Sequence, residues 1–257
     1  MIARHLPLFL AAASPLHAAE SAGQWFDHAA ERSWIENYDP TLITRRVLTE
    51  LSFEDRGSDD GIWKIENSFR WGVPLRADLA VGIQAMVPVK WQESGGDDLS
   101  GIGDLELRTG FVGRISPTLR WGFGLNAAFD TAAEPGLGAD AFVLRPIAAI
   151  RWDFNERIQL GFNLEYNVTP ADEGTNDVSQ LELKVPLVLK LSDRWSGALT
   201  YKPRWDFLDE SDRHRLELGA TRTLGADHQY ALSFAVELPL ASESFDSKLT
   251  AGLSWHF

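Results

Sequence analysis

The sequence contains no cysteine, which excludes disulfide bridges, thiolate metal sites, a catalytic cysteine and a lipid-anchoring cysteine. Basic residues are also few, because 24 Lys and Arg stand against 37 Asp and Glu, a net charge of -13 over 257 residues. This deficit argues against a nucleic-acid partner, since phosphate binding requires a basic surface. No stretch beyond the N-terminus approaches the ~20 apolar residues of a membrane helix.

The N-terminus has the pattern of a secretory signal peptide. A short basic start at residues 1–5 precedes an apolar core at 6–13 and small residues suited to cleavage after Ala18 or Ala19. We therefore predict that residues 1–19 are a signal peptide and that the mature chain is exported. An exported chain without membrane helices is either a soluble periplasmic or secreted protein or an outer-membrane β-barrel.

From residue 41 to the C-terminus, apolar and polar side chains alternate with a period of two. In residues 157–168, for example, every even-numbered residue is apolar and every odd-numbered residue between them is polar or glycine. This period predicts β-strands with two unlike faces. About twelve strands are expected, over residues 42–53, 62–72, 78–92, 102–113, 118–130, 141–153, 157–168, 179–191, 194–206, 213–224, 228–240 and 246–257.

The connections between these strands alternate in length. Acidic, glycine-rich loops such as 93–101 and 169–177 are long, whereas links such as 115–117 and 192–193 are short. Long outer loops and short periplasmic turns are typical of outer-membrane barrels. Each strand also has at least the ~9–11 residues that a spanning strand needs.

Two observations favour a membrane barrel over a soluble β-sandwich, whose strands would alternate in the same way. The chain ends on the apolar face with Phe257, as does the C-terminal strand read by the barrel insertion machinery. The tryptophans also share the apolar face and gather at two levels, as expected for aromatic girdles at the membrane interfaces. The predicted interface aromatics are Trp63, Trp91 and Trp205 at the outer level and Trp71, Trp121, Trp152, Trp195, Trp255 and Phe257 at the periplasmic level.

We therefore predict an all-β fold: a single antiparallel up-and-down transmembrane β-barrel over residues 41–257, in the outer membrane of a Gram-negative bacterium. Residues 20–40 form a separate N-terminal segment in this scheme. Helical spacing within 24–38 predicts a short helix that plugs the periplasmic mouth, and a disordered tether is the alternative.

The polar face of the predicted strands carries charges of both signs, with an excess of about five positive charges. A narrow lumen with a selective path for a small solute and a wall of purely structural salt bridges are both compatible with this pattern. The predicted lumen-lining residues are Arg46, Glu50, Lys64, Glu66, Arg70, Lys90, Asp104, Glu106, Arg108, Arg120, Asp130, Arg145, Arg151, Glu165, Glu182, Lys184, Lys190, Lys202, Arg204, Asp206, Arg213, Arg215, Glu217, Glu237 and Lys248.

The outer loops have the opposite charge, since they carry many acidic residues and a single basic one, Arg56. Divalent cations prefer such oxygen ligands and could bridge the loops to lipopolysaccharide phosphates, although acidic loops can equally be merely solvated. Five prolines fall inside strands, at Pro88, Pro146, Pro186, Pro203 and Pro239. They predict bulges, either as local irregularities or as a lateral opening toward the lipid.

One short motif resembles a known family. Gly101-Ile102-Gly103-Asp104, which follows an acidic loop and opens a strand, resembles the Gly-x-Gly-Asp strand start of outer-membrane barrels assigned to the MetA pathway of phenol degradation. The resemblance implies a channel or transporter-like barrel for a small aromatic or apolar solute. From the residues alone, the glycines permit a sharp turn and Asp104 points into the lumen, either as part of a solute path or as an ordinary lumen charge.

The expected function is passive passage of a small solute whose identity the sequence does not give. A structural or adhesive barrel with a closed lumen is the alternative, and a lipid hydrolase is disfavoured. A hydrolase requires a serine beside a histidine on the lipid face, and only His214 is outward near the outer leaflet, with Ser211 and Ser242 in loops. We expect no enzyme activity, cofactor or metal. The expected partners are outer-membrane lipid, lipopolysaccharide and the insertion machinery.

Overall fold

The computed structural model describes residues 41, 44–57, 60–94, 97–170, 177–225, 228–241 and 245–257. The predicted signal peptide at 1–19 and the helix expected within 20–40 lie outside these residues. No helix in the described part of the chain combines the length and the apolar character required to cross a membrane.

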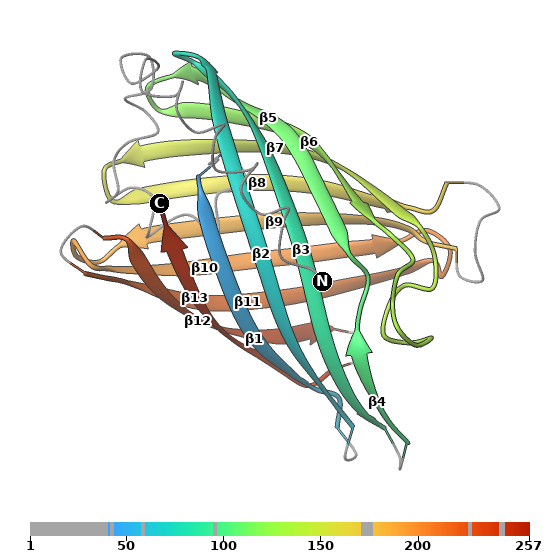
Figure 1. Cartoon of the computed structure of the whole chain (residues 1–257). Coiled ribbons are helices and arrows are strands. Elements are labelled where there is room, and N and C mark those ends of the chain that lie inside the picture. The colour runs from blue at the N-terminus through green and yellow to red at the C-terminus, as the bar shows by residue number, and fades with distance from the viewer. Residues whose placement is uncertain are drawn as a thin grey trace, which may run out of the picture.

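The described chain folds into thirteen antiparallel strands, twelve of which close into a single barrel (Figure 1). The strands are β1 (Arg46–Asp55), β2 (Gly61–Arg76), β3 (Leu79–Ser94), β4 (Asp97–Ile102), β5 (Glu106–Ser116), β6 (Leu119–Ala128), β7 (Val143–Asn155), β8 (Ile158–Val168), β9 (Ser179–Lys190), β10 (Trp195–Asp206), β11 (Ser211–Leu224), β12 (Tyr230–Ala241) and β13 (Ser247–His256).

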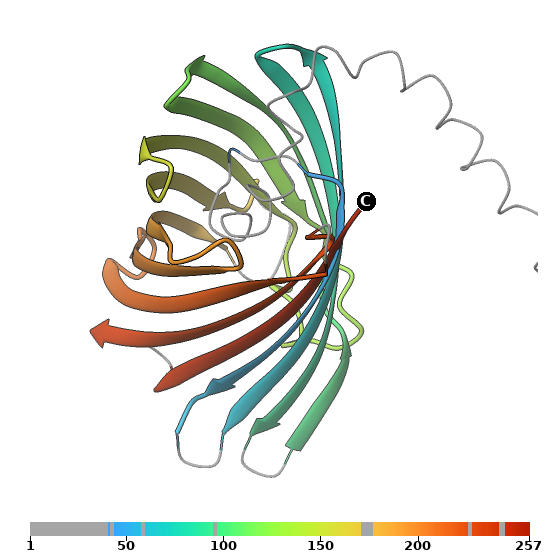
Figure 2. The ribbon, with the colours of Figure 1, turned by 90° about the vertical axis from the view of Figure 1, so that its left-hand side faces the viewer.

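The ring closes between the first and last strands. β1 pairs with β13 in unbroken register from Arg46 opposite His256 to Asp55 opposite Ser247, and it pairs with β2 on its other side. Figure 2 shows β1 and β13 side by side in the wall. Closure gives every strand of the ring two neighbours, and this removes the unpaired strand edges that a lipid environment would not tolerate.

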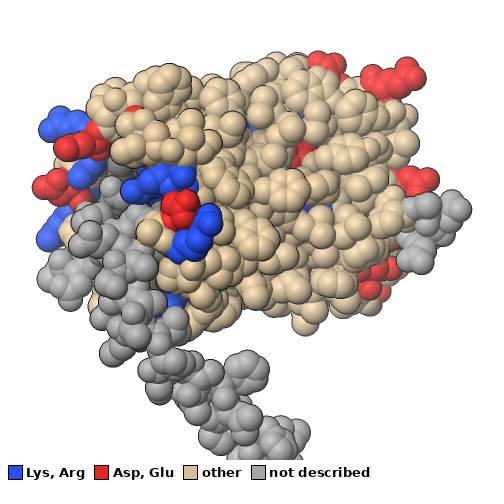
Figure 3. Space-filling view, turned by 90° about the horizontal axis from the view of Figure 1, so that it is seen from above, with Lys and Arg blue, Asp and Glu red and all other residues tan. Residues whose placement is uncertain are grey.

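The two faces of the wall differ in the way the alternation predicts. On β8, the odd-numbered Gln159, Glu165 and Asn167 are buried, whereas Phe162 and Leu164 on the other face are exposed. Figure 3 shows the consequence, a broad uncharged outer surface with charged side chains mainly at its two ends. A soluble sandwich would bury its apolar faces against each other. A wall with a polar inner face and an apolar outer face is therefore that of a transmembrane barrel.

The nine predicted interface aromatics all lie on the outward face near strand ends. Phe257 packs against Trp71 and Trp255, with ring centroids 5.9 and 5.1 Å apart, and so joins the closing strand to β2. Two arginines stack on tryptophans of the predicted periplasmic interface. The Arg45 guanidinium lies 4.5 Å from the Trp71 ring centroid, and the Arg222 guanidinium lies 5.4 Å from the Trp195 ring centroid. Amphipathic rings and cations at one level are compatible with a membrane interface there.

One expected loop contains regular structure. Residues 93–101 were expected as an irregular outer loop, but β3 continues to Ser94 and pairs there with β4, so most of the segment belongs to a β-hairpin. β4 pairs only with β3 and stands outside the closed ring. The alternation does not reveal this hairpin because its residues are small and acidic.

All five in-strand prolines lie beside an interruption in one of their two ladders. The β8–β9 ladder, for example, passes from Leu160 opposite Leu187 directly to Asn163 opposite Lys184, leaving Pro186 unpaired on that side. On its other side, Pro186 pairs in register with Thr200 of β10. Proline has no N–H to donate, which accounts for such gaps. The ladder beside Pro186 resumes in the same register, so that gap is a missing pair, whereas the register shift next to Pro239 marks a bulge. The ring remains continuous around all five prolines.

The outward face gives a first test of the membrane assignment. Leu218 lies midway along β11 and is 54% exposed, whereas Leu224 lies at the end of the same strand, two residues beyond Arg222. We expect Leu218→Arg to lower the free energy of unfolding in lipid vesicles by about 2 kcal/mol, because it places a charge near the bilayer midplane. Leu224→Arg should cost less than about 1 kcal/mol. If urea titrations gave equal losses of unfolding free energy for both variants, the proposed position of Leu218 near the bilayer midplane and of Leu224 near the interface would be contradicted.

Candidate functional site

The predicted lumen charges occupy inward-facing positions of their strands, except for Asp104, which lies between β4 and β5, and Asp130. Asp130 lies beyond the end of β6, where it is exposed in the loop to β7, so its assignment to the lumen is wrong. The alternation of the sequence continues to Asp130, but β6 already ends at Ala128. Asp206 ends β10 and accepts hydrogen bonds from the Gln180 amide and from the backbone N–H groups of Leu208 and Asp209. Asp206 therefore stabilises a turn as well as facing inward.

The largest ion-pair network joins four adjacent strands, β9 to β12. Lys202 bridges the carboxylates of Glu217 and Glu237, with 2.6 Å from its Nζ to the Glu217 Oε2. Arg215 binds Glu237 at 2.9 Å and also reaches the Glu182 carboxylate at 3.4 Å. These side chains are largely buried, so the network fastens neighbouring strands together on the inner surface.

Smaller pairs lie along the opposite part of the wall. The Glu106 carboxylate of β5 accepts bonds from Arg145 at 2.8 Å and from the Asn126 amide at 2.7 Å. Lys64 binds Glu66 within β2 at 3.0 Å, and Arg151 binds Asp153 within β7 at 2.7 Å. Most of the predicted lumen charges are therefore held by near neighbours in the wall rather than across the lumen.

A polar cavity of about 300 Å³ lies inside the barrel between these networks. Six basic and three acidic side chains line it, together with Asn163, Thr200, Ser233 and Thr250 among others. The basic residues are Arg46, Arg70, Arg108, Lys184, Lys202 and Lys248, and the acidic residues are Glu50, Glu217 and Glu237. Residues from nearly every part of the sequence therefore converge on one polar space.

Glu165 of β8 connects two basic residues of the cavity at longer range. Its Oε2 atom lies 3.9 Å from the Arg108 guanidinium of β5 and 4.0 Å from the Lys184 Nζ of β9. Neither distance is short enough for a hydrogen bond, and this oxygen is buried without a hydrogen-bond partner. The Glu165 carboxylate therefore faces both cations without a direct hydrogen bond, and the Lys184 Nζ lies closer to the Glu182 Oε1, at 3.5 Å.

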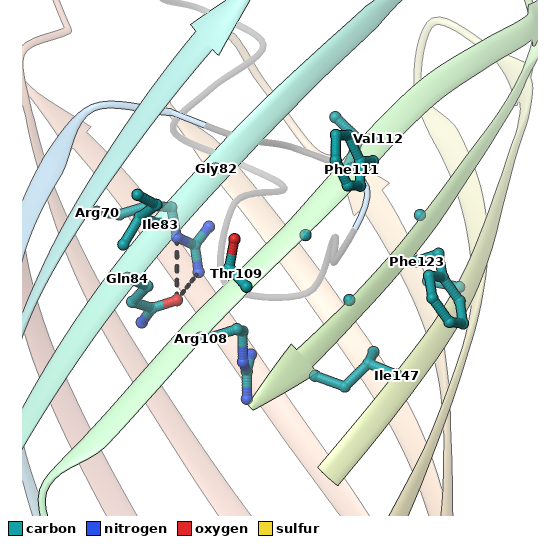
Figure 4. A pocket seen from close by; sticks show the side chains of 14 residues that line it. Arg70, Gly82, Ile83, Gln84, Arg108, Thr109, Phe111, Val112, Phe123 and Ile147 are labelled. Carbon is teal, nitrogen blue, oxygen red and sulfur yellow. Dashed lines mark hydrogen bonds between the residues drawn. The ribbon is translucent and has the colours of Figure 1, made fainter. Parts of the chain in front are cut away.

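Beside this cavity the wall carries a row of glycines. Gly72 pairs with Gly82, Gly82 with Gly110, and Gly110 with Gly124, so four neighbouring strands present no side chain at this level. A hollow of about 80 Å³ lies against Gly82, Gly110 and Gly124 of this row (Figure 4). Its lining also includes the exposed, outward-facing side chains of Ile83, Phe111 and Phe123. Its polar lining includes Arg108 and Arg70, whose guanidinium Nη2 donates to the Gln84 amide oxygen at 2.9 Å. The missing side chains widen the interior next to the cavity.

The Gly-x-Gly-Asp motif holds a loop at the outer end of the barrel. Asp104 lies in the break between β4 and β5, where its Oδ1 accepts the backbone N–H groups of Thr131 and Ala132, both at 3.2 Å. Its Oδ2 accepts the N–H of Ala139 at 2.6 Å. The Asp104 carboxylate therefore ties the β6–β7 loop to the inner side of the wall. Two further bonds join the same segments: the Ala133 N–H donates to the Ile102 carbonyl at 2.8 Å, and the Leu105 N–H donates to the Thr131 hydroxyl at 2.9 Å.

The glycines around Asp104 make room for that loop. A Cβ atom at Gly103 would lie 2.9 Å from the backbone oxygen of Leu137, and one at Gly101 would lie 3.1 Å from the Leu137 side chain. Leu137 itself is completely buried. On the loop side, a Cβ atom at Gly138 would meet the Asp104 carboxylate at 2.4 Å. Both segments thus need small residues for their close approach.

His214 offers little to a hydrolase. Its two ring nitrogens are engaged by Asp212, 2.8 Å from Nε2, and by the Tyr201 hydroxyl, 2.7 Å from Nδ1. Neither nitrogen therefore remains to activate a serine, and Ser211 lies on the inward side of β11. Among the residues that the structure describes, no group of three or more His, Asp or Glu side chains is placed to hold a metal ion.

Comparisons with known proteins bear on the fold. No family model and no curated protein matches the sequence. Among solved structures, the chain is similar to an outer membrane channel from Pseudomonas putida F1, with a TM-score of 0.67, 16% identity and coverage of 86% of this chain and 98% of that one. The CymD monoaromatic hydrocarbon channel matches with a TM-score of 0.57 and 9% identity over 88% and 93% of the two chains. The toluene transporter TbuX of Ralstonia pickettii matches with a TM-score of 0.51 and 9% identity over 87% and 93%. The chain therefore shares the fold of outer-membrane channels.

Proposed function

We propose that the protein is a passive channel for a small solute in the outer membrane of a Gram-negative bacterium. The observation that carries the proposal is the polar cavity of about 300 Å³ enclosed by a continuous ring of strands. A cavity of this kind is wide enough for a small solute, and its polar lining replaces the water that the solute gives up. The outward apolar face and the fold shared with outer-membrane channels support the location.

A structural barrel with a closed lumen is the competing function. It is favoured by the ion pairs that run along the wall, since such pairs would stiffen the barrel without any solute. The polar cavity favours the channel, because a purely structural interior gains stability from filling such space with side chains.

Uptake of glucose into lipid vesicles that contain the purified protein tests the proposal. We expect vesicle swelling with the natural protein and a loss of roughly tenfold in Thr200→Trp, since the buried Thr200 lines the cavity and an indole there would fill it. Leu199→Trp is the matched control, because Leu199 is the preceding residue and faces outward. No swelling with the natural protein would contradict the channel and favour the structural barrel.

A further inference from the structure

The cavity inside the barrel has an unbalanced charge. Its lining contains six basic and three acidic side chains, and two of the three carboxylates already have partners. Glu217 and Glu237 both bind Lys202, and Glu237 also binds Arg215. These two carboxylates therefore do little to balance the remaining basic residues of the lining.

Two of those basic residues have especially weak engagement. Lys248 of β13 lies opposite Glu54 and Glu237 in its two ladders, but it forms no ion pair or hydrogen bond within the described residues, because those carboxylates bind other cations. The nearest carboxylate oxygen to the Arg108 guanidinium is the Glu165 Oε2 at 3.9 Å, and the Nε atom of Arg108 is buried without a hydrogen-bond partner. Both cations face the enclosed lumen without a close partner, and a low-dielectric wall strengthens their field, so both groups favour a negatively charged molecule in the cavity.

Neutral polar atoms of the lining are also left without partners. The Asn163 side-chain oxygen and the Thr200 hydroxyl are both buried and make no hydrogen bond within the described residues. Both can accept a hydrogen bond from a hydroxyl group. The cavity of about 300 Å³ corresponds to roughly ten water molecules by liquid volume, which is comparable to a small sugar derivative.

We propose that this cavity binds and passes a small hydroxylated carboxylate, with Lys248 and Arg108 as the groups that favour its negative charge. The inference deepens the proposed channel function and rests on it. It assigns the excess positive charge of the cavity to solute selection rather than to the stability of the wall.

The acidic outer end of the barrel does not cancel this preference. Figure 3 shows acidic side chains standing out from one end of the molecule, where they are surrounded by solvent. Their field decays over about 8 Å at physiological ionic strength, whereas charges enclosed by the low-dielectric wall are screened much less. The net positive charge of the cavity lining therefore governs which solute is stabilised inside.

Reversal potentials in planar bilayers under a gradient of potassium gluconate test the inference with the purified protein. We expect gluconate to be about threefold more permeant than potassium in the natural barrel. Lys248→Gln and Arg108→Gln should each reduce this ratio, and the double variant should bring it close to one. Arg157→Gln is the matched control, because Arg157 is an exposed residue of the turn between β7 and β8 and does not line the cavity. Heat-modifiable migration in gels confirms that each variant folds.

The outcomes separate this inference from the channel function. A ratio below one, or a ratio that the Lys248 and Arg108 variants leave unchanged, would overturn the selectivity while glucose uptake still supported a channel. A silent bilayer combined with glucose uptake would likewise overturn the selectivity. A silent bilayer without glucose uptake would contradict the channel function itself.

Discussion

Replacement of Glu237 by glutamine should lower the free energy of unfolding by about 3–5 kcal/mol, the cost of breaking a buried ion pair by removing one partner. Glu237 is only 4% exposed and its two oxygens bind different cations, Lys202 and Arg215. The substitution keeps the shape of the side chain but removes its charge. Lys202 would then depend on Glu217 alone, and Arg215 on the Glu182 carboxylate 3.4 Å away.

Urea titrations of the barrel in lipid vesicles measure this loss. Glu156→Gln is the matched control, because Glu156 is an exposed residue of the turn between β7 and β8, and its replacement should change the stability by less than about 0.5 kcal/mol. The same small change in both variants would show that lumen water screens the network. The ion pairs would then contribute little to the stability of the wall.

The faces of the strands could be predicted from the sequence, because side chains alternate strictly with a period of two. That rule places Lys202 and Glu237 inside the barrel and Phe162 outside before any partner is known. The membrane character of the last strand could also be predicted, from the aromatic C-terminus. Phe257 on the apolar face predicts a membrane strand, and in the structure its ring packs against Trp71 of the second strand.

The ion pairs themselves could not be predicted, because they depend on the register between strands. Arg145 binds Glu106 across 39 residues of sequence, and a shift of one residue in any intervening ladder would send one of the two side chains to the outer face. A sequence shows on which face of its strand a charged side chain lies, but it does not show which residue lies opposite it on the neighbouring strand. Asp130 is misassigned for another reason: it continues the alternation of β6, but the strand has already ended before it.

The role of Asp104 was hidden for a different reason. The motif shows two glycines and an acid, but the groups that bind the acid are backbone N–H groups of residues 131, 132 and 139. Backbone donors cannot be recognised in a sequence, since every residue except proline has a backbone N–H group. The small residues that permit the contact, such as Gly138, are equally silent until the loop is placed against the wall.

Removal of this carboxylate should release the β6–β7 loop. In Asp104→Ala, three backbone N–H groups lose a charged acceptor, and such bonds contribute about 1.5–3 kcal/mol each before water replaces them. We expect a net local loss of about 3 kcal/mol, which corresponds to amide exchange at Thr131, Ala132 and Ala139 that is more than about 100-fold faster. Hydrogen–deuterium exchange read by mass spectrometry over residues 129–142 measures it.

Two further variants show whether the carboxylate itself holds the loop. Glu134→Ala, the matched control, removes an exposed carboxylate of the same loop that accepts none of these bonds, so exchange should rise less than about tenfold. Gly138→Ala should reproduce Asp104→Ala, because its methyl group would lie 2.4 Å from the Asp104 Oδ1 and push the two segments apart. If Asp104→Ala instead exchanged no faster than Glu134→Ala, the buried Leu137 and the bonds of Ala133 and Leu105 would hold the loop without the carboxylate, and the motif acid would be an ordinary inward-facing charge.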